Sequence, residues 1–182
     1  MKRTLFPIMA LALTTTAFIT STSIAQNAPT VQQTTAVTPP APPPQTMDLT
    51  IARKLAVVAE AAAATLNQHV AVCVMDTNGD VVLLERMDGG TRVPVNAAQG
   101  KARAVLLFGV PTGQISDAIR EKKPLSTTPK ALPAGGGEIT LLRGGLPIMK
   151  DGKMIGAIGV GGSTSENDEK FAQAGIDAVT AK

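Results

Sequence analysis

Residues 135–162, GGGEITLLRGGLPIMKDGKMIGAIGVGG, hold the pattern that decides the fold. Apolar runs separated by turn signals predict two or three short strands. Asp151-Gly152 lies between two such runs, where a type I′ hairpin turn with positive φ angles is expected. The last strand is interrupted by Gly156, Gly159, Gly161 and Gly162. Glycine inside a strand is typical of a close backbone approach, so we expect a central hairpin with another element packed tightly on it.

The chain before this hairpin shows alternating helix and strand signals. Expected elements are a helix over 49–68 capped by Asp48 or Thr50, strands over 69–76 and 81–88, and helices over 96–108 and 112–119. The turn Thr77-Asn78-Gly79-Asp80 joins the two strands into a hairpin. The many prolines and glycines of residues 121–137 predict a loop.

A final helix follows the glycine-rich hairpin. Ser163-Thr164-Ser165-Glu166 matches a capping box, with Ser163 as the N-cap and Glu166 at the third helical position. Asp168 and Glu169 add negative charge near the positive end of this helix. The element order is therefore α-β-β-α-α-β-β-β-α. Because hairpins dominate, we expect an α+β domain with a mostly antiparallel sheet.

Residues 1–25 match a secretory signal peptide. Basic Lys2-Arg3 is followed by an apolar segment over 5–19, and small residues Ser23 and Ala25 precede a cut before Gln26. The alternative is an uncleaved membrane anchor. Threonines at 14–16 shorten the apolar run below the roughly 20 residues that span a bilayer. We therefore expect export to the periplasm or secretion, and no membrane association after cleavage.

Residues 26–46 are uncharged and proline-rich, which predicts a disordered polyproline II linker. The folded domain is expected to span residues 47–182. Cleavage removes Lys2 and Arg3 and lowers the formal net charge from +3 to +1, which is weak evidence for an acidic partner. The absence of Trp, Tyr and any Lys/Arg cluster argues against a nucleic-acid partner. The single cysteine excludes an intramolecular disulfide and a cysteine-rich zinc site.

Four motifs, in this order of elements, resemble the GlcG/HbpS family, also called the haem-degrading domain family. They are Met87-Asp88-Gly89, Lys101-Ala102, Pro111-Thr112 and residues 144–169. The resemblance covers nearly all of residues 47–182 and implies a profilin-like or PAS-like α/β/α sandwich with a five-stranded antiparallel sheet. It also implies a homo-oligomer, often an octamer. Some exported members bind haem, and others are encoded near glycolate or diol metabolism. The family usually has serine where this chain has Gly161.

Four residues are candidates for binding haem: His69, Cys73, Arg92 and Lys101. His69 is the only histidine, and an imidazole is a good ligand for haem iron, which makes it the candidate metal ligand. The alternative is a solvated histidine at a strand edge. Cys73 lies on the same strand face as His69 if the strand alternates. Its thiolate could ligate iron, but cysteine is also a common small core residue, the reading that we favour.

Arg92 and Lys101 are the candidate cations for haem propionates or a small carboxylate. The alternative for both is a solvated helix face or an ion pair between subunits. Glu166, Asp168 and Glu169 could bind a metal ion, but their spacing fits helix capping better. No acid–base pair at a fixed spacing and no nucleophile elbow is recognisable, so we assign no catalytic residue.

These observations favour an exported haem-binding protein, a sensor or scavenger, over an enzyme. The alternative is an enzyme or binding protein for a small organic acid related to glycolate or diol metabolism.

Overall fold

The computed structural model describes residues 47–130 and 136–180. The expected signal peptide and proline-rich linker lie outside these residues. The elements in chain order are α1 (Leu49–Ala64), β1 (Ala71–Asp76), β2 (Val81–Arg86), α2 (Val93–Phe108), α3 (Thr112–Arg120), β3 (Gly145–Lys150), β4 (Lys153–Gly161) and α4 (Ser165–Thr180). No helix among them is long and apolar enough to cross a membrane.

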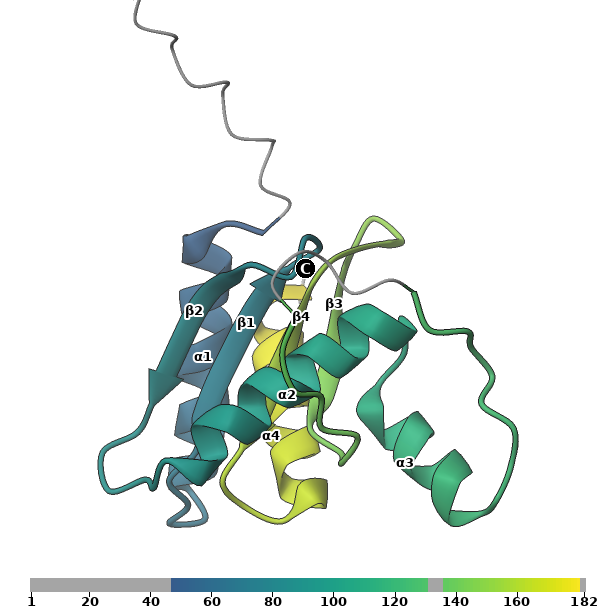
Figure 1. The fold of residues 1–182 in the computed structure, drawn as a ribbon. Coiled ribbons are helices and arrows are strands. Elements are labelled where there is room, and N and C mark those ends of the chain that lie inside the picture. The colour runs from purple at the N-terminus through teal and green to yellow at the C-terminus, as the bar shows by residue number, and fades with distance from the viewer. Residues whose placement is uncertain (1–46, 131–135, 181–182) are drawn as a thin grey trace, which may run out of the picture. The chain divides into compact units, whose positions relative to one another are not determined.

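The strands form one sheet in the order β2-β1-β4-β3, and each neighbouring pair is antiparallel. Helix α2 crosses one face of the sheet, and α1 and α4 cover the other (Figure 1). The expected α+β class and antiparallel sheet are confirmed. The expectation of five strands is wrong, because the described part of the chain forms four. The apolar run at 139–142 is not a strand, since Thr140 packs on Gly100 of α2 instead of pairing with a sheet edge.

The core lies on both faces of the two central strands. In β1, every residue is buried and successive side chains alternate between the faces. Val72 and Val74 pack with residues of α1 and α4. Ala71, Cys73 and Met75 pack under α2. Burial on both faces explains why β1 is an almost continuous apolar run.

Glycines in β4 bring α2 close to the sheet, as the sequence predicted. A Cβ atom on Gly159 would collide with the carbonyl oxygen of Ala98 and lie 2.8 Å from the backbone nitrogen of Ala102. At the turn before β4, Asp151 and Gly152 have φ angles of 49° and 72°. Both values are positive, as a type I′ turn requires.

Two helix starts agree with the sequence and two differ; α3 begins at Thr112, as expected. Asp48 caps α1, accepting a hydrogen bond from the backbone N–H of Ile51 at 2.9 Å. Helix α2 begins at Val93, before the predicted residue 96, because Pro94 is compatible with a first helical turn.

The predicted capping box before α4 is out of register. The Oγ1 atom of Thr164, not of Ser163, accepts from the backbone N–H three residues later, that of Asn167, at 3.3 Å. The N–H of Ser163 donates to the carboxylate of Asp168 at 2.9 Å. Glu166 is exposed. Thr164 caps the helix in place of Ser163, because the backbone N–H of Ser163 is bound to the buried Asp168 carboxylate.

Candidate functional site

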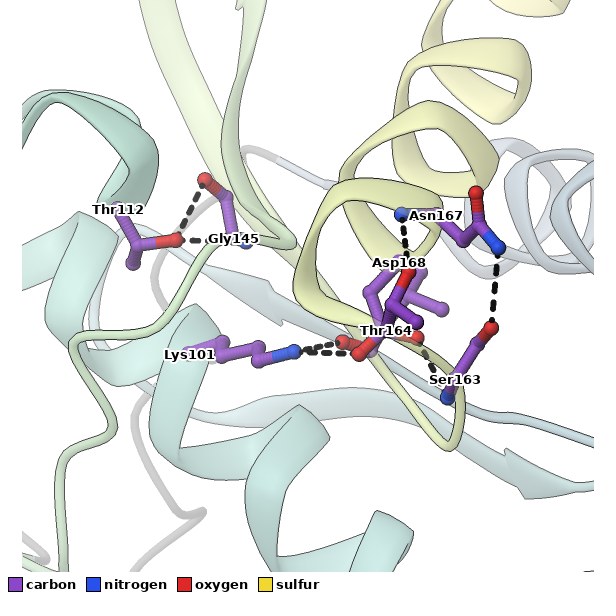
Figure 2. Close-up of polar contacts among 8 residues, drawn as sticks. Lys101, Thr112, Gly145, Ser163, Thr164, Asn167 and Asp168 are labelled. Carbon is purple, nitrogen blue, oxygen red and sulfur yellow. Dashed lines mark hydrogen bonds and ion pairs between the residues drawn. The ribbon is translucent and has the colours of Figure 1, made fainter. Parts of the chain in front are cut away.

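A buried ion pair lies where α2, the end of β4 and the first turn of α4 meet. The Nζ atom of Lys101 donates to Oδ2 of Asp168 at 2.7 Å and to the carbonyl oxygen of Val160 at 2.8 Å (Figure 2). The side chains of Lys101 and Asp168 are only 3% and 4% exposed. Charges buried to this degree must be paired, so the two residues depend on each other.

Glycine at the start of β3 makes room for this pair. A Cβ atom on Gly144 would lie 2.9 Å from the Nζ of Lys101, and Gly144 has a φ angle of +112°. A side chain at this position would therefore be strained and would crowd the amine. The next residue, Gly145, donates its N–H to the Oγ1 atom of buried Thr112 at 2.9 Å, which fixes the start of α3 to β3 (Figure 2).

The environment of Lys101 opposes its positive charge. Burial lowers the pKa of the Lys101 amine from its ordinary value, and the Asp168 carboxylate only partly reverses that effect. Lys101 therefore differs from the solvated lysine that the sequence allowed.

A pocket of about 300 Å³ lies against the ion pair. Its polar lining includes the hydroxyl residues Thr91, Ser163 and Ser165 beside Lys101 and Asp168. Its apolar lining includes Val93 and Leu142, whose exposed fractions of 75% and 57% place them at the mouth. The volume is at the lower end of the roughly 300–1,000 Å³ typical of small-molecule sites. The pocket thus combines hydroxyl and charged side chains with two exposed apolar side chains at its rim.

His69 is exposed, and its backbone borders this pocket at Gly162. A Cβ atom on Gly89 would lie 3.4 Å from both Nδ1 and Cε1 of the imidazole, so the ring packs on the Gly89 backbone. The carbonyl oxygen of His69 faces Gly162, which lines the pocket. His69 therefore occupies the end of the sheet where β1 begins and β4 ends, the end at which α2 and α4 both start (Figure 1).

Arg92 and Lys101 belong to the same end of the sheet, but Cys73 does not. Arg92 is exposed, follows Thr91 of the pocket wall and immediately precedes α2. Cys73 is buried under α2, opposite Gly159 in the β1–β4 register. Burial raises the pKa of the Cys73 thiol to about 12, so the thiolate is disfavoured at neutral pH.

The sequence did not reveal the partners of Lys101. Asp168 is 67 residues away along the chain, and its position in the first turn of α4 had suggested a helix-dipole contact instead. Glu169 pairs with Arg143 at 3.0 Å. Within residues 47–130 and 136–180, no group of three or more His, Cys, Asp or Glu side chains could hold a metal ion.

Comparison with known proteins identifies the family of this α/β/α domain. The family model described as "Haem degrading protein HbpS-like" matches residues 47–177, and the chain belongs to this family. This result confirms the resemblance drawn from the motifs.

Individual relatives cover most of the described domain. An uncharacterized 15.0 kDa protein of Citrobacter freundii, from the dhaT-dhaS intergenic region, is 32% identical over 135 residues, 74% of this chain and 93% of that protein. A crystal structure of a double mutant of Streptomyces reticuli HbpS has a TM-score of 0.64 and 27% identity, covering 85% of this chain and all of that one. A crystal structure of a PduOC–haem complex has a TM-score of 0.63, covering 74% and 95% of the two chains; at 24% identity it shows the fold alone.

Proposed function

We propose that this protein is an exported haem-binding protein that senses or scavenges haem. The observation that carries the proposal is the exposed imidazole of His69, in a residue whose backbone borders a pocket with an apolar rim, in a chain of the HbpS-like family. A neutral imidazole is a common axial ligand of haem iron. Its packing on Gly89 fixes the position of the ring and leaves the side chain accessible to a ligand.

The apolar part of the macrocycle would contact the pocket mouth. Val93 and Leu142 expose apolar side chains there, and such exposed apolar groups favour a flat apolar ligand. We assign His69 as the metal ligand and keep Cys73 as the less favourable choice, because burial under α2 would have to be relieved first.

The haem propionates need cations or backbone donors. Arg92 is exposed at the start of α2, a helix whose first turn has no side-chain cap. The helix dipole favours anions at such an end. Lys101 is a poorer candidate, since its ammonium already donates to Asp168 and Val160. Because the Asp168 carboxylate already neutralises the charge of Lys101, a small organic acid is a less favoured ligand than haem.

Self-association is part of the proposal. Val81 and Leu84 on the edge strand β2, and Val57 on α1, expose apolar surface that a second copy of the chain could cover. Light scattering of the purified protein measures the mass of the assembly. A monomeric mass at micromolar concentration would contradict this part of the proposal without affecting the haem part.

A haem titration followed by absorbance tests the main proposal. We expect a saturable shift of the Soret band in the wild-type protein and loss of that shift in His69→Ala. Gln68→Ala, at the neighbouring position, should retain it. A shift that persists in His69→Ala would move the ligand to another residue, such as Cys73 or a methionine. The absence of any saturable shift in the wild type would refute haem binding.

A further inference from the structure

Lys101 is a buried lysine that also lines a pocket. The side chain is 3% exposed, yet it forms part of the wall of the 300 Å³ pocket, beside Asp168. Its two hydrogen-bond acceptors, Asp168 and Val160, account for two of the three N–H groups of an ammonium. The geometry therefore places a buried lysine in the wall of a pocket, with its Nζ atom 2.7 Å from a carboxylate oxygen of another lining residue.

The surroundings of this nitrogen suit a nucleophile. A lysine amine must lose its proton before it can attack carbon, and burial is the usual way in which proteins favour the neutral form. Burial lowers the pKa of Lys101 in this structure. Asp168, whose Oδ2 atom already accepts a hydrogen bond from Nζ, is placed to receive the proton. Buried lysines with these properties form Schiff bases in other proteins.

We propose that Lys101 binds a small aldehyde or ketone covalently and reversibly, as an imine. The proton of the ammonium passes to the Asp168 carboxylate, and the Nζ lone pair attacks the carbonyl carbon. The oxygen of the resulting carbinolamine leaves as water, with the proton held by Asp168 and one proton from the nitrogen. The nitrogen keeps its third proton, so the product is a protonated imine paired with the Asp168 carboxylate. One C=N bond replaces one C=O bond, one molecule of water is released, and no oxidant or reductant is consumed.

The pocket lining indicates the class of carbonyl compound. A volume of about 300 Å³ admits a small molecule only. The hydroxyl groups of Thr91, Ser163 and Ser165 can donate to or accept from hydroxyl groups of the ligand. The charges of Lys101 and Asp168 cancel each other, so the described lining of the pocket offers no free cation for an acid. A short, uncharged hydroxyaldehyde therefore fits better.

This inference goes beyond haem binding and does not depend on it. It uses the inner wall of the pocket, whereas the haem proposal uses His69, Arg92 and the rim. Either can fail while the other stands.

Reductive trapping tests the inference on the haem-free protein. The protein is incubated with glycolaldehyde and cyanoborohydride, and the modified lysines are located by peptide mass spectrometry. The exposed Lys54 and Lys170 serve as internal standards. Below its pKa, each unit by which an amine's pKa falls raises the neutral fraction about tenfold, so we expect Lys101 to be modified several-fold faster than either standard.

Two exposed positions provide a matched pair of variants. Leu142→Trp should narrow the pocket mouth and slow modification of Lys101. Ile119→Trp, at a similarly exposed position of α3 outside the pocket lining, should leave that rate unchanged. Neither substitution touches the buried core, so both variants are expected to fold. Modification of Lys101 no faster than that of Lys54 and Lys170 would overturn the proposal. Equal modification rates in Leu142→Trp and the wild type would also overturn it, since the amine would then not be reached through this pocket.

Discussion

Replacing Lys101 by methionine should destabilise the protein strongly. Methionine keeps the length of the side chain but removes the ammonium, which leaves the Asp168 carboxylate buried with the Ser163 N–H as a remaining partner. Breaking an exposed ion pair costs only about 0–1 kcal/mol, whereas removing one member of a buried pair costs about 3–5 kcal/mol. Side chains that are 3% and 4% exposed belong to the second case. We therefore expect Lys101→Met to lose about 3–5 kcal/mol of unfolding free energy.

The double variant Lys101→Met/Asp168→Leu separates a buried charge from general damage. With both charges removed, the carbonyl of Val160 and the N–H of Ser163 lose their side-chain partners. Each unpaired group lowers the free energy of unfolding by about 1–3 kcal/mol. Packing of the new apolar side chains offsets part of this loss. The double variant should therefore be more stable than Lys101→Met alone, although it carries two substitutions.

Urea unfolding followed by circular dichroism measures these differences. Lys54→Met, at an exposed position of α1, is the control and should change stability by less than about 0.5 kcal/mol. Asp168→Leu alone completes the set of variants. If Lys101→Met or Asp168→Leu alone fails to fold while the double variant folds, the reasoning is also supported. A loss below about 1 kcal/mol in Lys101→Met, or simple additivity of the two substitutions, would refute it.

Three further predictions concern packing, titration and a second ion-pair group. Gly159→Ala should cost about 1–3 kcal/mol in urea unfolding, because its Cβ would meet the backbone of α2; an unchanged midpoint would contradict the close packing. Cys73 should react with a thiol reagent only after unfolding, and stability should fall as pH rises from 9 toward 12. The unfolded thiol loses its proton near pH 9, whereas the folded thiol keeps it to about 12, so the folded state binds more protons in this window. The fall should be shallower in Cys73→Ala, and equal slopes would contradict this assignment. Arg143→Ala removes the pairs with Asp117 and Glu169, whose side chains are only partly buried, and should cost about 1 kcal/mol or less; a loss as large as that of Lys101→Met would show that this group is not screened by solvent.

Local patterns predicted the parts of the fold that depend on neighbouring residues. The Asp151-Gly152 turn needs two adjacent positive φ angles, and the Asp48 cap needs an N–H three residues away. Both were found where the sequence indicated them. The wrong expectation of a fifth strand depended on tertiary packing. The run at 139–142 could have paired with a sheet edge but instead lies against α2 at Gly100.

The candidate site was only partly predictable for the same physical reason. Lys101 and Arg92 were singled out by their charge, and His69 by being the only histidine. No local pattern could pair Lys101 with Asp168 across 67 residues. The capping box failed because Asp168 had a second, buried role that the motif S-T-S-E does not encode.

Gly161 connects the packing of α2 with the chemistry of the pocket. A Cβ atom there would lie 2.9 Å from the carbonyl oxygen of Pro94 and 3.1 Å from the Cβ of Ala97, so the start of α2 packs directly on the end of β4. A serine at this position would need α2 to move by a few tenths of an ångström. Pro94 and Ala97 both line the pocket. Its shape, and its polar groups at Thr91, Ser163 and Ser165, are therefore coupled to this glycine, which makes position 161 a determinant of what the pocket can accept.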